Sequence, residues 1–544
     1  MSLASYFLAR AARLPKARFR TTRQRNIRVT MRDGVTLETD VFLPRNGVRS
    51  PTIMMRVPYG LNGFATVAEM FAERGFNTVI QACRGTSKSG GEFDPLTNER
   101  DDGLATLDWI KTQPWFDGRL GLSGPSYLGY AQWAISDALP KQAAMSVKVT
   151  SAEFQSIVFP NNSFNLTLMF GWMQVVEGIR SNPLRVFGDM LSGGIEKRTL
   201  SASLKLPLLE ADKRISGKEI PFWRRWLGNF DKHSAFWEPL DHTHRIGTRT
   251  PPTSFVSGWY DFMLDQLLRD YASLTEAGVR TRLTVGPWWH ISEELQLESM
   301  RDTLSWMTAE LLGDRSGLHD KPVRLFVSGA DEWHSFTAYP PGIPDTQIWH
   351  LHPEKVLSQR PVKTSEPDRY TYDPKKPTPN VGGAMFAFSG AGPLNQATLE
   401  SRNDVLVFSS EPLFTDLTII GQVSAVIYAR ASLTNADIFV KLCDVDEKGV
   451  STNICDGIIR KSSADPAVPD DIWKLNFKLH ATAHTFKRDH RLRLIVASGA
   501  HPRYIRNTGT DEPMGTTTKL LPVNVEIFHD PTRPSAIHLP VFEL

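Results

Sequence analysis

The first half of the chain alternates between short apolar runs and stretches whose apolar positions recur about every 3.6 residues. The short runs are typical of buried strands, and the periodic stretches are typical of amphipathic helices. Strands are predicted at 26–31, 35–43, 51–57, 77–82, 118–123, 252–258 and 281–286. Helices are predicted at 64–74, 101–111, 127–139, 262–277 and 294–312. Buried strands separated by helices predict a mostly parallel sheet covered by helices.

Two regions break this alternation. Residues 150–245 contain helical segments and many aromatic residues but no convincing strand, which predicts a helical cap inserted into the α/β domain. From about residue 322, short β-rich runs between Pro, Gly and Asp turns predict an all-β domain of jelly-roll type, with the stretch 353–385 crossing its surface. The expected division is a basic arm at 1–25, an α/β domain at 26–149 and 246–318, the cap at 150–245 and the β domain at 319–544.

Composition and charge narrow the class of protein. Hydrophobic residues make up 41% of the chain and charged residues 22%, so a folded globular protein is expected. Lys and Arg number 62 against 59 Asp and Glu, a balance that predicts no nucleic-acid partner. The chain has no apolar run of about 18 residues, so no membrane span is expected. Three cysteines make no disulfide framework and fit no zinc spacing, which favours a reducing, cytoplasmic location.

The first 30 residues carry eight Lys or Arg and no acidic residue. An Arg-rich, acid-free start resembles an organelle transit peptide, and a basic surface arm packed on the α/β domain is the favoured alternative. The order of a secretory signal is absent, because the basic residues follow the apolar patch Tyr6–Leu8 instead of preceding it.

The sequence Gly121-Leu-Ser-Gly-Pro-Ser-Tyr-Leu-Gly129 joins a predicted strand to a predicted helix. A strand, a tight turn with small neighbours and a helix are the context of a nucleophile elbow, with Ser126 at its tip and Gly124 giving it room. The spacing departs from the usual motif, because Leu128 stands two positions after the serine and Gly129 stands three. A serine that merely caps the helix is the alternative.

A serine hydroxyl needs a base that is oriented by a third group. In α/β-hydrolases the acid and then the histidine follow the serine, each at the carboxyl end of a strand. One predicted strand runs into Asp261 and the next runs into His290. Ser126, Asp261 and His290 are therefore predicted to form a catalytic triad. Asp265 is the second candidate for the acid, although it lies one turn into the next helix.

Short motifs are spread along most of the chain. They are Arg56-x-Pro-Tyr59, Arg84-Gly85 with Gly90-Gly-Glu-Phe93, Trp115-x-Asp-Gly118, Gly124-x-Ser-Tyr-x-Gly129, Phe236-Trp237, Gly258-Trp-Tyr-Asp261, Gly286-Pro-Trp-x-His290, Gly329-Ala-Asp-x-Trp333 and Arg503-x-x-Arg506-Asn507-Thr508. In this order they resemble the X-Pro dipeptidyl-peptidase and cocaine esterase family of serine hydrolases, over about residues 26–544. The resemblance implies an α/β-hydrolase domain, a helical cap and a C-terminal jelly roll.

The resemblance also implies an oxyanion hole made of a tyrosine hydroxyl and a backbone amide, and the matching positions are Tyr59 and the N–H of Tyr127. A donor fixed where negative charge develops contributes roughly 2.7–4 kcal/mol to catalysis. One departure concerns Arg84: many relatives carry an Asp two residues before it, where this chain has Ala82. This puts a carboxylate contact to Arg84 in doubt, but not the triad.

Aromatic residues supply the candidates for the substrate pocket. Phe170 and Trp172 are expected to line an apolar acyl pocket, with Trp289 beside the base. His350 and His352 lie two apart on a presumed strand without a third ligand, so no metal is expected. No Gly-rich phosphate loop occurs, and no cofactor is implied.

These observations predict a serine hydrolase that cleaves small-molecule carboxylic esters, and in the wider case amides, through an acyl-enzyme. One alternative is an X-Pro dipeptidyl aminopeptidase, or an acylase for α-amino esters or β-lactams. Both need carboxylates that bind a substrate ammonium, for which Glu153 and Glu177 of the cap are the candidates. Another alternative is a non-catalytic protein whose jelly roll binds sugar. The sequence leaves the acyl group, the alcohol and the oligomeric state open, a homo-oligomer included.

Overall fold

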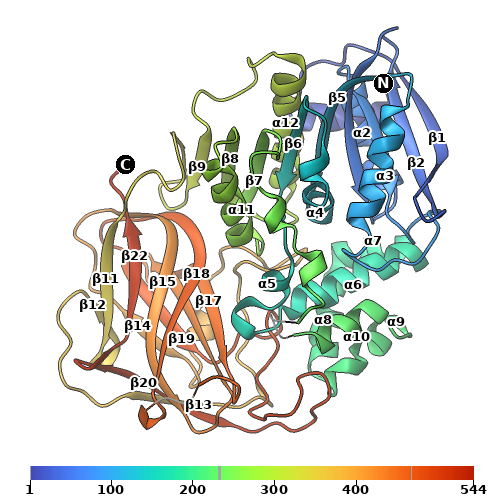
Figure 1. Cartoon of the computed structure of the whole chain (residues 1–544). Coiled ribbons are helices and arrows are strands. Elements are labelled where there is room, and N and C mark those ends of the chain that lie inside the picture. The colour runs from blue at the N-terminus through green and yellow to red at the C-terminus, as the bar shows by residue number, and fades with distance from the viewer. Residues whose placement is uncertain (1, 231–233, 467–468) are drawn as a thin grey trace.

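The apolar runs of the α/β part assemble into one ten-stranded sheet with the order β1-β2-β4-β3-β5-β6-β7-β8-β9-β10. Its strands are β1 (Thr21–Thr30), β2 (Thr36–Pro44), β3 (Ser50–Val57), β4 (Asn77–Ala82), β5 (Phe116–Pro125), β6 (Ala143–Lys148), β7 (Thr253–Tyr260), β8 (Thr281–Trp289), β9 (Val323–Val327) and β10 (Glu332–Phe336). Strands β3 to β9 pair in parallel with one another, and β1, β2 and β10 pair antiparallel. Figure 1 shows this sheet in a computed structural model that describes residues 2–230, 234–466 and 469–544.

Helices cover both faces of this sheet. They are α1 (Leu3–Ala11), α2 (Asn62–Ala72), α3 (Glu99–Lys111), α4 (Tyr127–Trp133), α11 (Leu264–Glu276) and α12 (Glu293–Met307). Neighbouring residues of a strand point to opposite faces, so Ile53 packs with α1, α2 and α12 whereas Met54 packs with α3, α4 and α11. The predicted α/β-hydrolase sheet is confirmed, and the central strands are buried on both sides.

The sheet departs from the predicted strands at β6 and at the start of β1. Strand β6 was not predicted, because its run ends in a lysine; Lys148 is buried and pairs with Asp302 at 2.9 Å. Strand β1 begins at Thr21, inside the segment expected to be a basic arm. The rest of that segment includes α1, whose Ser5 hydroxyl donates to Glu73 Oε1 at 2.9 Å.

The first sheet continues past the boundary expected between residues 318 and 319. Strand β9 pairs in parallel with β8, and β10 pairs with β9, so both extend the first sheet. Alternate residues of β9 are buried. In sequence, a short strand with this pattern looks the same whether it extends a parallel sheet or begins a β domain.

The cap is inserted between β6 and β7. Its helices are α5 (Gln155–Val158), α6 (Leu166–Ser181), α7 (Pro183–Ser192), α8 (Gly194–Ser203), α9 (Ala211–Ser216) and α10 (Pro221–Gly228). Aromatic rings from α6 and α10 form much of its core, as in the pair Phe170 and Trp223, whose ring centroids lie 4.9 Å apart. The aromatic residues that the sequence concentrates in this segment therefore hold the helices together.

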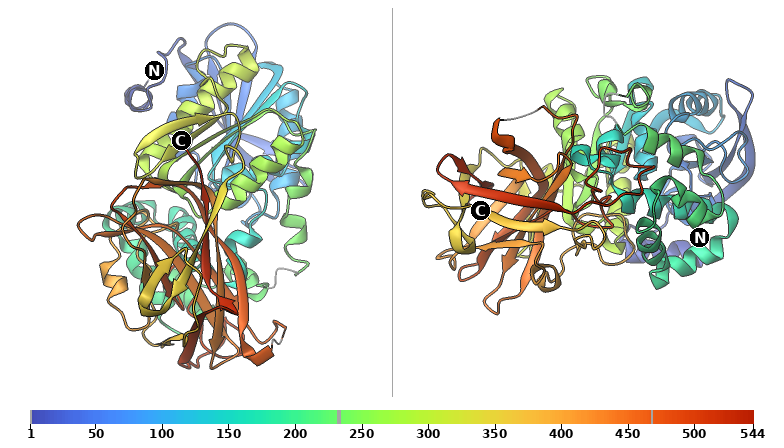
Figure 2. Two further views of the ribbon diagram at one scale, coloured as in Figure 1. Left: turned by 90° about the vertical axis from the view of Figure 1, so that its left-hand side faces the viewer. Right: turned by 90° about the horizontal axis from the view of Figure 1, so that it is seen from below.

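The C-terminal part is an all-β domain, as predicted, in which the strands pair antiparallel apart from β12 and β14. Its strands are β11 (Asp345–His352), β12 (Val356–Ser358), β13 (Asp368–Tyr372), β14 (Leu406–Ser409), β15 (Leu417–Ala431), β16 (Ala436–Val445), β17 (Ser451–Lys461), β18 (Trp473–Phe486), β19 (Arg491–Ala497), β20 (Val523–Asp530), β21 (Arg533–Pro534) and β22 (Ala536–Val541). A short helix, α13 (Ala397–Glu400), precedes β14. Figure 2 shows this domain as a separate body against the α/β sheet.

One irregular segment of the β domain reaches the other two parts. Its residue Phe388 donates its backbone N–H to Glu196 Oε1 of α8 at 2.7 Å. Gly392 of the same segment lies against the ring of Trp289 at the end of β8, and its carbonyl accepts from Asn453 of β17 at 3.2 Å. The three parts therefore meet near the carboxyl ends of β7 and β8.

Candidate active site

Ser126 sits at the sharp turn between β5 and α4. Its backbone has φ 56° and ψ −122°, a left-handed conformation that a serine adopts only under strain. The turn is held because Ser126 N–H donates to Lys148 O at 2.8 Å, and Ser126 O accepts from Thr150 Oγ1 at 2.7 Å. This is the geometry of a nucleophile elbow, in which the hydroxyl projects from the edge of the sheet.

Two glycines explain the unusual spacing of this motif. Gly124 has φ +138°, and a Cβ there would come within 2.4 Å of the Leu128 side chain. A Cβ at Gly129 would come within 2.4 Å of Thr150. Leu128 fills the space beside Gly124, and Gly129 is the position where α4 approaches Thr150, just after the end of β6. The usual second glycine is thus displaced by one residue without loss of the turn.

Asp261 and His290 lie beside Ser126, each just after its strand. His290 Nε2 is 3.0 Å from Ser126 Oγ, and His290 Nδ1 is 3.0 Å from Asp261 Oδ1. Asp261 is fully buried and also accepts from Met263 N–H at 2.9 Å and from the Ser257 hydroxyl at 3.1 Å. These contacts fix the carboxylate, so that the imidazole is held between an acid and a serine.

Aromatic rings from two parts of the molecule enclose the imidazole of His290. The Phe262 ring lies at 4.5 Å between ring centroids, tilted by 35°, and Phe386 of the β domain lies at 6.0 Å. Phe386 fits a notch at Gly171 of α6, where a Cβ would come within 2.6 Å of its ring. The sequence did not indicate Phe386, because it follows the stretch 353–385 that was expected to cross the surface; that stretch instead ends at the cap, where Ala384 is buried.

Tyr59 follows β3, and its hydroxyl oxygen accepts a hydrogen bond from Trp172 Nε1 at 3.0 Å. Burial raises the pKa of Tyr59 to about 12, against the lowering effect of its hydrogen bonds with Trp172 and Ser126. The phenol is therefore protonated at neutral pH and able to donate. Its place beside Ser126 is the one that the oxyanion-hole prediction requires.

Tyr127 is the first residue of α4, where a helix leaves backbone N–H groups without partners inside the helix. Its side chain is anchored at the hydroxyl, which donates to Glu99 Oε1 at 2.8 Å and accepts from Leu96 N–H at 2.9 Å. Glu99 is in turn paired with Arg56 at 2.5 Å, and both are buried. Arg56 of the motif Arg56-x-Pro-Tyr59 thus acts through Glu99 to hold the ring of Tyr127.

A narrow cavity opens beside Ser126. It is lined by Tyr59, Leu96, Ser126, Tyr127, Phe154, Leu168, Met169, Trp172, Trp226, Met263 and Phe386. Within the described parts of the chain, this lining contains no charged side chain. Trp172 of α6 is part of this lining, and its role in substrate binding stays a prediction.

Phe170 and Trp289 are corrections to the predicted pocket. Phe170 is fully buried against Trp223 inside the cap and does not line the cavity. Trp289 lies against Gly392 of the β domain, outside the lining. Helix α6 presents Leu168, Met169 and Trp172 to the cavity; Phe170, two residues from Trp172, faces nearly the opposite way.

Asp265 and Arg84 also have partners elsewhere. Asp265 pairs with His480 Nδ1 of the β domain at 3.1 Å and accepts from Ala481 N–H at 3.0 Å, so it docks two parts of the molecule together. Arg84 binds Asp102 at 2.6 Å and Asp33 at 2.7 Å. Arg84 therefore contacts two carboxylates from other parts of the chain, although the position of Ala82, where many relatives carry an Asp, offers none.

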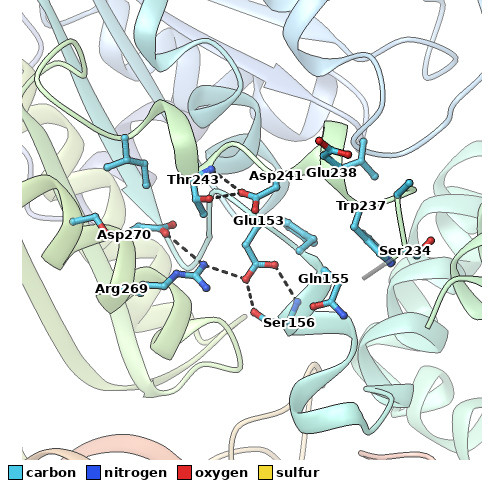
Figure 3. Close-up of a pocket in the computed structure, with 15 residues that line it drawn as sticks. Glu153, Gln155, Ser156, Ser234, Trp237, Glu238, Asp241, Thr243, Arg269 and Asp270 are labelled. Carbon is cyan, nitrogen blue, oxygen red and sulfur yellow. Dashed lines mark hydrogen bonds and ion pairs between the residues drawn. The ribbon is translucent and has the colours of Figure 1, made fainter. Parts of the chain in front are cut away.

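The cap acids lie in other places than the cavity beside Ser126. Figure 3 shows Glu153 in a second pocket, here called the carboxylate pocket, where it pairs with Arg269 at 3.1 Å and accepts from Ser156 N–H at 3.0 Å. Asp270 lines the same pocket, and burial raises its pKa to about 7 despite Arg269. Phe154 lines both cavities and is their shared wall.

Glu177 is the second predicted acid of the cap. It pairs with Lys218 at 2.6 Å and lines neither the cavity beside Ser126 nor the carboxylate pocket.

Over residues 2–230, 234–466 and 469–544, no group of three or more His, Cys, Asp or Glu side chains is arranged to hold a metal ion. No helix within the same residues has the length and apolar character needed to cross a membrane.

Comparison with known families adds a decisive observation. Residues 33–292 match the family described as X-Pro dipeptidyl-peptidase (S15 family), and residues 318–538 match the X-Pro dipeptidyl-peptidase C-terminal non-catalytic domain. The chain belongs to the X-Pro dipeptidyl-peptidase family. The resemblance read from the motifs is confirmed, and the two matches correspond to the α/β part and the β domain of this structure.

Members of this family include serine esterases as well as peptidases, and the chain is similar to both. It is 29% identical to cocaine esterase of Rhodococcus sp. (strain MB1 Bresler), with 95% of this chain and 98% of that protein covered. In structure it is similar to an aminopeptidase from a Thaumarchaeota archaeon (TM-score 0.81, 21% identity) and to an α-amino acid ester hydrolase (TM-score 0.81, 20% identity). Both similarities cover 97% of this chain and 98% of the other. The protein is an enzyme, a serine hydrolase.

Proposed function

We propose that this protein hydrolyses uncharged carboxylic esters through an acyl-enzyme formed on Ser126. The observation that carries the proposal is the pair of 3.0 Å contacts that links Ser126 Oγ to His290 and His290 to Asp261. A serine hydroxyl in contact with an oriented base is an activated nucleophile. The strained elbow supports the same role, because it aims the hydroxyl away from the sheet and toward the cavity.

The proposed reaction has two halves. Ser126 Oγ attacks the ester carbonyl while His290 Nε2 takes its proton, and Asp261 stabilises the imidazolium through Nδ1–H. The tetrahedral intermediate collapses, the alcohol leaves with the proton from Nε2, and the acyl group stays on Ser126. Water then attacks the acyl carbon with His290 as base, which releases the acid and restores the serine hydroxyl.

Tyr59 and Tyr127 are the proposed oxyanion donors. The Tyr59 hydroxyl, protonated because burial raises its pKa to about 12, donates from one side of Ser126. The backbone N–H of Tyr127 donates from the start of α4. Donors that are fixed before the reaction stabilise the transition state more than the ground state, so they act mainly on kcat.

The lining of the cavity supports uncharged acyl groups. Its side chains are apolar or aromatic apart from the hydroxyls of Tyr59, Ser126 and Tyr127. Burial of an acyl chain there is favourable by about 25 cal/mol per Å² of apolar surface. A substrate ammonium would lose its hydration without a carboxylate to replace it. Glu153 is already paired with Arg269 on the far side of Phe154, which weighs against the aminopeptidase and amino-ester alternatives.

The test of this proposal is the variant Ser126→Ala. We expect it to lose nearly all hydrolysis of p-nitrophenyl butyrate and all labelling by a fluorophosphonate, with an unchanged circular dichroism spectrum. Ser156→Ala, in the carboxylate pocket, is the matched control and should keep both. Labelling of Ser126→Ala at another serine, with turnover retained, would refute the proposal. If neither the unchanged protein nor Ser156→Ala hydrolysed the ester or was labelled, the proposal would also fail, and the non-catalytic alternative would be favoured.

A further inference from the structure

Trp172 of the cap makes the hydrogen bond that reaches the proposed oxyanion donor. Its Nε1 lies 3.0 Å from the Tyr59 hydroxyl oxygen, and its side chain is largely buried. An indole N–H donates and does not accept. The direction of this bond is therefore fixed by chemistry: the oxygen of Tyr59 is the acceptor.

This direction decides where the hydroxyl hydrogen of Tyr59 points. A phenol carries a single hydrogen, which rotates to suit its partners. Because Trp172 occupies an acceptor site on the oxygen, the hydrogen is turned toward another partner, and Ser126 is the other side chain that acts on this hydroxyl through hydrogen bonding. Accepting one hydrogen bond also makes an O–H a stronger donor in the next.

The same indole contacts the second donor residue. Trp172 stacks on the ring of Tyr127 at 6.1 Å between centroids, with 15° between the planes, and on Trp226 of the cap at 6.3 Å and 13°. The Tyr127 ring is anchored below by Glu99, as described above. One cap side chain thus lies between both residues of the proposed oxyanion hole and the rest of the cap.

We propose that Trp172 is a positioning residue, whose indole N–H orients and polarises the Tyr59 hydroxyl so that docking of the cap completes the oxyanion hole. This inference rests on the proposed function and adds to it. It differs from the role of an acyl-pocket wall, which Trp172 also has as a lining residue. A wall acts on substrate binding and on long acyl chains, whereas a positioning group acts through Tyr59 on the transition state alone.

A double-mutant cycle with Trp172→Phe, Tyr59→Phe and the double variant separates the two roles. Phenylalanine keeps an aromatic ring in the stack and removes the N–H. With p-nitrophenyl acetate, whose acyl group is small, we expect kcat of Trp172→Phe to fall about tenfold with KM within twofold. In the Tyr59→Phe background the same substitution should change kcat less than twofold, because the oxygen that accepts the bond is gone.

Binding of phenylboronic acid gives a readout without turnover. It forms a tetrahedral adduct on a serine. Its Kd should rise about tenfold in Trp172→Phe, and the Kd of the double variant should equal that of Tyr59→Phe. Trp223→Phe, which removes an indole N–H from the cap core outside the cavity lining, is the matched control and should leave kcat and Kd within twofold. If Trp172→Phe folds poorly, replacement by benzothienylalanine keeps the shape of tryptophan without the N–H and should give the same loss.

Independent, multiplicative effects of the two substitutions would overturn the positioning role. So would a KM defect that grows from acetate to butyrate while kcat stays normal, because that is the behaviour of a wall. Both results leave labelling of Ser126 by fluorophosphonate intact, so they are distinct from a failure of the proposed function.

Discussion

The cavity beside Ser126 and the carboxylate pocket share Phe154 as a wall, yet they are built from opposite chemistry. The cavity has hydroxyls and aromatic rings around a strained serine, and its lining is uncharged. The carboxylate pocket is lined by Glu153, Glu238, Asp241 and Asp270, and Arg269 pairs with Glu153 and Asp270. The acids are therefore near the proposed reaction centre in space but separated from it by a phenyl ring.

The contacts of these acids explain the difference. Glu153 and Asp270 accept backbone N–H groups of Ser156 and Ala152, and Arg269 of α11 lies between them. They tie the start of the cap to the α/β domain. Carboxylates that already have buried partners contribute little to binding of a substrate ammonium, because a new hydrogen bond would replace an existing one. Proximity of acids to a serine is thus a poor guide to substrate charge.

The largest difference between the two cavities is expected on removal of a single hydroxyl. Tyr59→Phe should lower kcat on a p-nitrophenyl ester by about 10²–10³ with little change in KM, because the lost donor acts mainly in the transition state. Glu153→Gln, the matched polar change in the carboxylate pocket, should leave kcat within twofold. A near-normal kcat in Tyr59→Phe would make Tyr59 a rim residue and nothing more.

Substrate charge should produce the next effect. We expect kcat/KM for methyl phenylacetate to be about 10² or more times higher than for the methyl ester of phenylglycine. The second ester differs by an ammonium group, and the cavity offers this cation no carboxylate. Ala-Pro-p-nitroanilide should likewise be a poor substrate. The assays should be run at pH 6.5, where the amine is charged, with Ser126→Ala protein as blank. Equal rates for the two esters would favour the α-amino ester alternative.

A smaller side chain at Phe154, the wall shared by the two cavities, should weaken the preference for the uncharged ester. Phe154→Leu removes part of the ring between the cavity and Glu153, so the preference for the uncharged ester should shrink by about two- to tenfold. Phe386→Leu shortens a wall of the cavity that does not border the carboxylate pocket and is the matched control. An unchanged preference in a folded Phe154→Leu protein would show that the acids lie too far away to act on the substrate.

The smallest effect concerns stability and pH. Because burial raises the pKa of Asp270 to about 7 from an ordinary value of 3.8, the folded protein holds this proton where the unfolded chain releases it. The stability that this proton contributes is complete below pH 3.8 and is lost as pH rises through 7. Three pKa units correspond to roughly 4 kcal/mol as an upper bound.

Asp270→Asn should therefore flatten the fall of Tm between pH 5 and 8.5 by a few degrees. The measurement is thermal unfolding at both pH values, with Glu238→Gln, an exposed change in the same pocket, as reference. A slope in Asp270→Asn as steep as in the unchanged protein would show that this carboxyl titrates in its ordinary range.

Much of the site could be predicted because it obeys a rule of topology. The carboxyl ends of parallel strands meet at one edge of a sheet, so residues that follow three different strands become neighbours. Ser126, Asp261 and His290 each follow such a strand, and the structure brings them within 3.0 Å contacts. Asp265 sits four residues beyond Asp261, and this one turn of helix carries it to His480 instead.

The positions of side chains from the cap and the β domain could not be predicted in the same way, and the reasons are physical. Phe170 was chosen for its residue type, and helix phase turns it into the core of the cap. Phe386 follows no periodic segment, and its position is set by contacts with Gly171 and His290 from distant parts of the chain. Lys148 made a buried strand look too polar, because its charge is matched by Asp302 far along the chain. Long-range partners of this kind leave no local pattern.

The placement of Phe386 has a consequence for the order of events during synthesis. The residues around Ser126 are all translated by the time His290 leaves the ribosome, but the ring that closes over that histidine belongs to a domain still to be made. At roughly 5–20 residues per second, residues 291–544 take about 13–50 seconds to synthesise. During this interval the nascent α/β domain carries its serine, histidine and aspartate beside a cavity that lacks one wall. The cavity beside Ser126 is therefore completed late, when the segment that carries Phe386 has docked.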